Sequence, residues 1–208
     1  MDAAAVEIRV LGCLIEKQRT TPDAYPLSLN SLRLACNQAT NREPVVDYDE
    51  ETIRAALRRL SSRGWVRLAS GAGSRAVKYR HLFDDALGLG DAELALLCVL
   101  MLRGPQTPGE LKGRTERLHS FGSLEAIHET LEGLIERELV ARLPRRPGQK
   151  EERYRQLLGG DGAGGAPAEE AATGDDVEAR LRRLEDDVAS LRQALESLRA
   201  EVARPGPS

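Results

Sequence analysis

The chain has 208 residues, of which 30% are charged and only 3% are aromatic, and its formal net charge is −3. This length suffices for one large domain or for two small domains and a tail, and so few aromatic residues argue against one large aromatic core. Charges interrupt the apolar N-terminal segment, which is unlike a signal peptide, and no apolar run approaches the roughly 20 residues of a membrane span. We therefore expect a cytoplasmic protein without a membrane partner.

The charge is unevenly distributed along the chain. Residues 1–83 carry 13 basic and 9 acidic side chains, residues 84–158 carry 11 and 13, and residues 159–208 carry 6 and 11. Only the first of these segments has the positive balance that suits a polyanion such as DNA.

The first segment begins with three predicted helices. Apolar residues at helical spacing predict the first helix over residues 6–17. Ser28 can cap a short second helix, and Asp49 or Asp47 can cap a third. The third helix should bury a stripe that consists of Ile53, Leu57 and Leu60.

The polar stretch "ACNQATNREPVV" (35–46) lies between the second and third helices. Cys36 shares helical spacing with Leu29 and Leu32, and none of the three histidines has a local reason to face it, so we expect a core position rather than a nucleophile. Pro44 disfavours helix, which makes the stretch a connector. Its candidate phosphate contacts are Thr40, Asn41 and Arg42.

Alternating apolar and polar residues on either side of residues 71–74 predict a β-hairpin after the third helix. The pattern then returns: Ile53, Leu57, Leu60 and Val66 match Ile127, Leu131, Leu134 and Val140 at an offset of 74. The second copy has a helical pattern at 92–102, candidate caps at Thr107 and Ser123, and turn residues at 147–148. The predicted fold is mainly α with small β-hairpins (α+β), as two tandem winged helix-turn-helix domains over residues 1–83 and 84–158.

A Gly- and Ala-rich stretch at 159–176 reads as a flexible linker. Beyond it, apolar residues alternate at spacings of four and three, which is typical of a coiled coil over residues 177–203. A single helix docked on its own domain is the alternative, and a trimer or an antiparallel pair stays open. The seam consists of Val177, Leu181, Leu184, Val188, Leu191, Leu195, Leu198 and Val202.

A winged-helix domain usually places its third helix in the major groove and its hairpin against the DNA backbone. Six basic residues of the first domain are therefore the candidate DNA contacts, although outward arginines often form only a solvated face. On the third helix they are Arg54, Arg58 and Arg59, and on the hairpin they are Arg75, Lys78 and Arg80.

The second copy carries His128, Glu132 and Gly133 where the first has Arg54, Arg58 and Arg59. Glu125, Glu129 and Glu136 lie on the same predicted helix. A helix that faces phosphates would not carry this many acids. We expect this domain to mediate dimerisation or to bind a protein partner instead of DNA.

The blocks "LGCLIEKQRTTPDAYPLSLNSLRLACNQATNREPVVDYDEETIRAAL" and "GSRAVKYRHLF", with "RGPQTPGELKGRTERLHSFGSLE" in the second copy, resemble the YceH family of uncharacterised bacterial proteins over about residues 6–158. The resemblance implies tandem winged-helix domains and brings no substrate or catalytic residue. Because the connector is part of the most recognisable block, it also suggests a specific surface beside the third helix.

Two functions follow from these patterns. The first is a DNA-binding, homodimeric transcriptional regulator, and the alternative is a protein-interaction scaffold that uses the second domain or the coiled coil. We expect no enzyme, because the sequence lacks a Walker A loop, GxSxG, HExxH and a paired-carboxylate signature. Three scattered cysteines form no CxxC pair, so we expect no metal site and no cofactor.

Overall fold

A computed structural model describes residues 3–69, 77–145 and 151–159. The chain divides into two compact units, residues 1–166 and 167–208, and every described residue belongs to the first. The predicted coiled-coil seam and the hairpin residue Arg75 lie outside the described residues and stay predictions.

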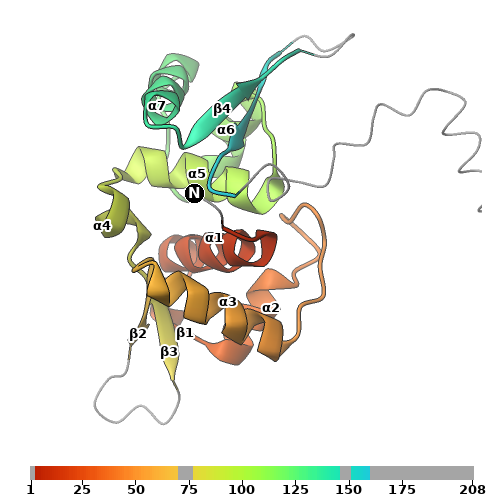
Figure 1. Cartoon of the computed structure of the whole chain (residues 1–208). Helices are drawn as coiled ribbons and strands as arrows, with labels where there is room; N and C mark the ends of the chain where they lie inside the picture. Colours follow the sequence, from red (N-terminus) through yellow and green to blue (C-terminus); the bar gives the residue numbers. More distant parts are fainter. Residues whose placement is uncertain (1–2, 70–76, 146–150, 160–208) are drawn as a thin grey trace, which may run out of the picture. The chain divides into compact units, whose positions relative to one another are not determined.

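An order of three helices followed by two paired strands occurs twice along the chain, and the first repeat carries two further short elements between its first two helices (Figure 1). The first repeat comprises α1 (Ala5–Thr20), the short 3-10 helix η1 (Pro22–Ala24), β1 (Leu27–Ser28), α2 (Leu29–Cys36), α3 (Glu50–Ser62), β2 (Val66–Ala69) and β3 (Lys78–His81). After α4 (Phe83–Leu87), the second repeat comprises α5 (Asp91–Arg103), α6 (Pro108–Thr115), α7 (Leu124–Glu136), β4 (Val140–Leu143) and β5 (Arg153–Gln156). The fold is thus mixed α and β with small antiparallel sheets.

Side-chain caps fix where four of these helices begin. The hydroxyls of Ser28, Thr107 and Ser123 accept hydrogen bonds from backbone amides in the first turns of α2, α6 and α7. Asp49, rather than the alternative Asp47, caps α3 by accepting from the Thr52 amide at 2.8 Å. Each cap satisfies an amide that has no partner inside its helix, and these predictions are confirmed.

The core stripes of the third helix in each repeat are also confirmed. Ile53 and Leu60 in α3 have no exposed surface, and neither do Ile127, Leu131 and Leu134 in α7. The first hairpin pairs Val66 with His81, and β1, which the sequence pattern did not predict, joins the other edge of β3. In the second repeat β4 and β5 form a two-stranded sheet.

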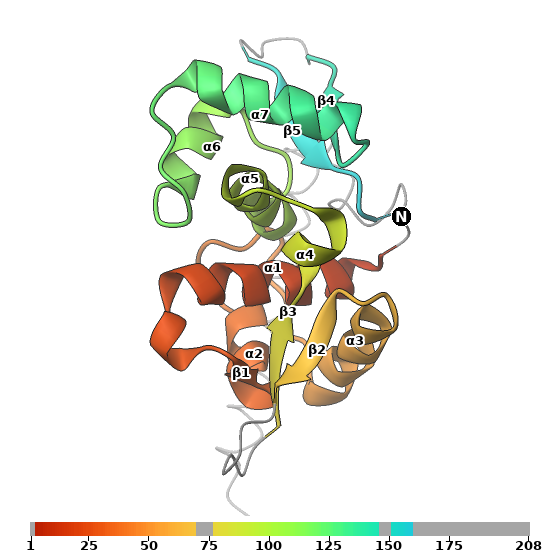
Figure 2. The same cartoon turned by 90° about the vertical axis from the view of Figure 1, so that its left-hand side faces the viewer.

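The two repeats pack against each other through their first helices, α1 and α5 (Figure 2). Cys98 of α5 donates a hydrogen bond through its sulfur to the Gly12 carbonyl of α1 at 3.4 Å. An ideal Cβ on Gly12 would lie 2.9 Å from Leu102 Cδ2 and 3.2 Å from Met101 Cβ, so glycine permits this close approach. One continuous apolar core therefore spans both repeats, while the hairpins extend toward opposite ends of the pair in both views.

Among the described residues, no helix has the length and apolar content needed to cross a membrane.

Gly12→Ala should destabilise the protein. Overpacking a tight core typically costs about 1–3 kcal/mol, which exceeds the ~0.5–1 kcal/mol that alanine contributes inside a helix. Urea unfolding of the full chain would measure the change. Gly113→Ala is the matched control, because nothing lies within 4 Å of a Cβ on that α6 residue, and it should leave stability unchanged or raise it. Equal stability of the two variants would contradict tight α1–α5 packing.

Candidate nucleic-acid interface

The outward face of α3 carries two arginines one helical turn apart. Ile53 and Leu57 turn inward, whereas Arg54 and Arg58 are exposed. Arg54 Nη2 lies 3.8 Å from Glu50 Oε2, and both side chains are half exposed. An exposed pair at this spacing contributes only about 0.3–0.5 kcal/mol, so a stronger anionic ligand can displace it. Glu50 and Glu51 lie in the first turn, where carboxylates favour the positive end of the helix.

A shallow hollow adjoins this face where the start of α2, the start of α3 and strand β3 meet. Arg54 and Glu50 line it from α3, Val77 and Tyr79 from the hairpin, and Ser28 through Asn30 from α2. Val77 is 57% exposed. The hollow thus combines an apolar wall with the guanidinium of Arg54.

The hairpin cations lie on the other face of the sheet. Successive side chains of a strand alternate between faces. Val77 and Tyr79 line the hollow beside Arg54, so Lys78 and Arg80 must face away from it. Among the described residues, the structure therefore does not bring Arg54 and Arg58 together with Lys78 and Arg80 into one patch.

Arg67 of β2 lies on the same face of the sheet as Lys78 and Arg80. It stands directly opposite Arg80 in the antiparallel register, an arrangement in which like charges repel. Folding the sequence about the predicted turn at 71–74 would have placed residue 67 opposite residue 78, because that turn is centred on 72.5 whereas the observed register is symmetric about 73.5. A phosphate backbone would relieve the repulsion.

Arg59 has a structural partner inside the protein. Its Nε lies 2.5 Å from Oε1 of Glu7, an α1 carboxylate that is only 2% exposed, and Arg63 Nε lies 3.7 Å from the other oxygen. A buried carboxylate is costly unless it is paired. The charge of Arg59 therefore helps to hold α3 on α1. Its side chain is still 52% exposed, so its predicted contact with DNA stays a prediction.

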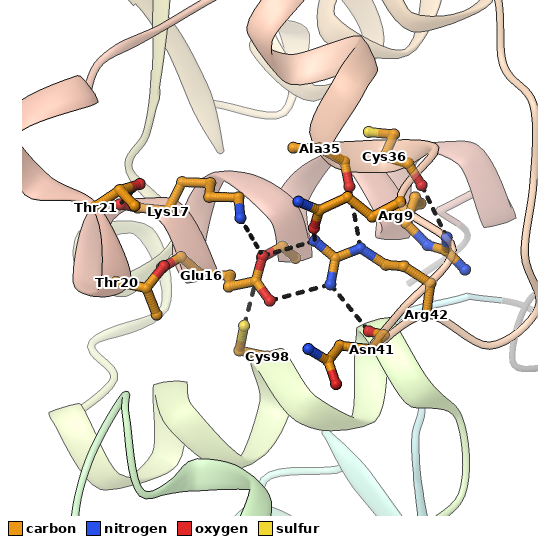
Figure 3. A network of polar contacts seen from close by, with 12 residues as sticks. Arg9, Glu16, Lys17, Thr20, Thr21, Ala35, Cys36, Asn41, Arg42 and Cys98 are labelled. Carbon is orange, nitrogen blue, oxygen red and sulfur yellow. Dashed lines mark hydrogen bonds and ion pairs between the residues drawn. The ribbon is translucent and has the colours of Figure 1, made fainter.

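Arg42 is buried, with a side chain that has no exposed surface. It forms a bidentate ion pair with Glu16 of α1, at 3.0 Å from Nη1 to Oε1 and 2.6 Å from Nη2 to Oε2 (Figure 3). Further donors reach the Ala35 carbonyl and the Gln38 side-chain oxygen. The predicted phosphate contact by Arg42 is therefore corrected: no part of its guanidinium faces solvent.

Arg9 of α1 holds the same connector from the other side. It donates to the Cys36 carbonyl at 3.1 Å and to the Pro44 carbonyl at 2.6 Å. Cys36 itself is fully buried, which confirms its predicted core position. Two buried arginines thus donate to four backbone carbonyls of the connector.

The second repeat also contacts the connector. The Glu43 amide donates to the Leu102 carbonyl of α5 at 2.8 Å, and Arg103 donates to the Asn41 side-chain oxygen. Thr40 and Asn41 themselves are exposed, so their predicted contact with phosphate stays a prediction. The path of the chain into α3 thus depends on α1 and on α5.

Three cysteines are buried where α1, α2 and α5 lie. Cys13, Cys36 and Cys98 are all free and buried, and burial raises the pKa of Cys98 well above its usual value. Within residues 3–69, 77–145 and 151–159, no group of three or more His, Cys, Asp or Glu side chains could hold a metal ion.

The outward face of α7 has the opposite chemistry. His128 and Glu132 occupy the positions of Arg54 and Arg58, and both are exposed together with Glu125 and Glu129. Glu132 forms an ion pair with Arg142 of β4. This face is unsuited to phosphate.

The geometry defines a tandem-repeat protein with one basic and one acidic outward helix. A family model described as "Protein of unknown function, DUF480" matches residues 3–149. A UPF0502 protein of Solibacter usitatus is 50% identical over 200 residues, covering 94% of this chain and 95% of its own. The UPF0502 protein YceH of Salmonella paratyphi C is 44% identical over 211 residues, covering 97% and 98%. The chain belongs to this family, and the resemblance to YceH is confirmed.

Arg42→Ala should lower the stability of the fold by about 1–3 kcal/mol, because the partly buried carboxylate of Glu16 loses its bidentate partner and keeps only Lys17, while the Ala35 carbonyl loses its donor. Chemical unfolding would measure the loss. Arg33→Ala is the control: Arg33 donates to Asn30 on the exposed side of α2, and its loss should change stability by less than about 0.5 kcal/mol.

The loss of stability caused by Arg42→Ala should also depend on pH. Burial alone would raise the pKa of Glu16, but the hydrogen bonds and charge of Arg42 outweigh it and hold that pKa below its usual value. A carboxyl group whose pKa is lower in the folded than in the unfolded protein stabilises the fold at every pH above its unfolded pKa of about 4.3. This contribution is lost as the pH falls through the folded pKa. The two proteins should therefore converge in stability in acid. A constant difference from pH 7 to pH 3 would contradict the ion pair.

Proposed function

We propose that the chain is a DNA-binding protein, and that its two repeats are tandem winged helix-turn-helix domains. In each repeat three helices precede a β-hairpin, which is the order of elements in that fold. Under this proposal α3 is the recognition helix and the hairpin of β2 and β3 is the wing. The role is non-enzymatic.

One observation carries the proposal, namely the difference between the outward faces of α3 and α7. The two helices share their core stripe, yet only α3 presents two exposed arginines, at positions where α7 has His128 and Glu132. Core packing does not require this difference. Arginine can donate two hydrogen bonds to a guanine edge in the major groove, which makes Arg54 and Arg58 suited to base contacts.

Arg67, Lys78 and Arg80 support a backbone role for the wing. They share one face of the hairpin, the face that turns away from the hollow. Under this proposal they contact phosphates outside the groove that α3 enters, as a wing does. Such contacts release counterions and raise affinity without selecting a sequence.

We further propose that the protein acts as a homodimeric transcriptional regulator. The heptad pattern over residues 177–203 favours a paired coiled coil. Two chains would present two copies of α3 to two half-sites, which is how helix-turn-helix proteins commonly gain affinity and specificity.

A protein-interaction scaffold is the second candidate function. The exposed acids of α7 favour it, since that repeat is poorly suited to a polyanion. Binding of DNA by the first repeat and of a protein by the second are compatible within one chain, because the two hairpins extend toward opposite ends (Figure 1).

Arg54→Ala/Arg58→Ala should abolish sequence-selective binding while the fold stays intact. Selection of genomic DNA fragments at about 150 mM salt, where nonspecific phosphate binding is weaker, would compare this variant with the unaltered chain. Each lost bidentate contact should cost about 1–3 kcal/mol. Arg114→Ala/Arg117→Ala removes the same charge from the second repeat and should keep the selected motif. Failure of the unaltered chain to enrich any motif would refute the proposed function.

Arg67→Ala/Arg80→Ala should weaken binding to all duplexes equally. Each lost phosphate contact should reduce the slope of log affinity against log salt by about 0.9. A salt titration with the selected motif and with a scrambled duplex would measure both effects. A loss confined to the selected motif would instead assign these arginines to base contacts.

A further inference from the structure

The first turn of α3 carries two exposed glutamates, although carboxylates repel phosphates. Glu50 and Glu51 directly follow the capping residue Asp49. Acids in a first turn favour the positive end of a helix, which is one reason for their presence. The second repeat indicates which of the two glutamates the helix itself needs.

Only one of the two glutamates is retained in the second repeat. At the offset of 74 residues, Glu51 corresponds to Glu125, an acid in the first turn of α7. Glu50 corresponds to Leu124, which is 41% exposed. A capping side chain begins both helices. Since a cap and one first-turn acid are enough to begin α7, the formation of this helix does not require an acid at the position of Glu50.

Glu50 and Arg54 occur together in the first repeat and are both replaced in the second. Arg54 corresponds to His128, so α7 lacks both members of the pair. In α3 the two groups lie 3.8 Å apart, from Nη2 to Oε2, and both side chains are half exposed. Both also line the hollow between α2, α3 and strand β3. A pair this exposed contributes little to stability, so its restriction to one repeat indicates a ligand of that repeat.

The two side chains are placed to reach neighbouring base pairs. Residues four apart on a helix have their Cβ atoms about 5–6 Å apart, and successive base pairs of a duplex are separated by about 3.4 Å. Contacts from one helical turn can therefore fall on base pairs that are adjacent or one step apart. Glu50 and Arg54 also lie in the N-terminal part of α3, which is the part of a recognition helix that contacts base edges.

A carboxylate distinguishes the bases by their donors and acceptors. When ionised it can only accept hydrogen bonds. In the major groove cytosine presents the N4 amino donor, guanine presents the acceptors O6 and N7, and thymine presents the acceptor O4. Adenine places the acceptor N7 beside its N6 amino group. A carboxylate at a base edge is therefore attracted by cytosine and repelled by guanine and thymine.

We propose that Glu50 selects cytosine at one position of the DNA site, beside the base pair that Arg54 contacts. This inference rests on the proposed DNA-binding function and specifies how the site is recognised. When the duplex enters, the weak ion pair is exchanged for two base contacts: the carboxylate accepts from cytosine N4, and the guanidinium donates to guanine O6 and N7. Glu51 keeps its role at the start of the helix.

Selection from a library of random duplexes at about 150 mM salt would test this role, with the full-length chain beside its Glu50→Gln and Glu50→Ala variants. Glutamine pairs with adenine N6 and N7, so Glu50→Gln should shift the preferred base at one position from cytosine to adenine. Glu50→Ala should lose all preference at that position and keep the others. Replacing this cytosine should weaken binding about tenfold or more for the unaltered chain, and less than about twofold for Glu50→Ala, in fluorescence-anisotropy titrations.

Two variants serve as matched controls. Glu51→Gln removes the same charge from the same helical turn and should select the unaltered motif. Arg54→Ala should lose the preference for guanine at the neighbouring position and keep the cytosine. Both Glu50 variants retain the Asp49 cap and the acid at Glu51, so they should fold normally, which urea unfolding would verify.

Three outcomes would overturn the proposal while DNA binding itself is upheld. In the first, the unaltered chain enriches a motif and both Glu50 variants enrich the same one. In the second, Glu50→Ala loses the same position as Arg54→Ala, which would make Glu50 a residue that only orients Arg54. In the third, Glu51→Gln shifts the motif as Glu50→Gln does. If the unaltered chain enriches no motif, the proposed function is refuted and the role of Glu50 falls with it.

Discussion

The burial of Arg42 is the constraint on which the arrangement of the first repeat depends. A guanidinium cannot lose its charge in a protein, so burying it requires an acceptor for each donor group and a carboxylate nearby. Glu16 supplies the carboxylate, and carbonyls of the connector supply further acceptors. The connector is therefore bound to α1 at a fixed place, and α3, which begins at Glu50, starts from a fixed position. A polar segment that resembles a surface loop in sequence is in fact held by the interior.

The same connector also contacts the second repeat. Leu102 and Arg103, at the end of α5, contact Glu43 and Asn41, while the packing of α5 on α1 continues the core from one repeat into the next. Removal of the second repeat would expose the α1 face around Gly12 and leave the Glu43 amide without its partner. The second repeat is thus part of the structure that supports α3, in addition to any ligand of its own.

The sequence alone predicted what depends on local spacing. Helix caps, the stripe of Ile53, Leu57 and Leu60, and the hairpin after α3 all follow from contacts between residues close in the chain. It did not predict the burial of Arg42 or the pairing of Arg59 with Glu7, because both depend on partners 26 and 52 residues away. An arginine on a polar stretch has the same local pattern whether it faces phosphate or a buried carboxylate. Internal repetition was the exception: it related distant residues before any contact was known.

Repetition also explains how two different ligands could be served by one architecture. The residues that hold each third helix in place lie on its inner stripe, and those that would contact a ligand lie outside it, so either set can change without the other. Between α3 and α7 the inner stripe is kept while arginine is exchanged for histidine and glutamate. A hollow lies beside each third helix. Tyr79 and Tyr154 line the two hollows at equivalent positions, whereas Glu50 of the first is replaced by Leu124 in the second. The duplicated scaffold therefore keeps one core while the outward faces of its third helices differ in charge. Because the repeats share a core, a ligand that bound either repeat would stabilise the structure on which the other depends.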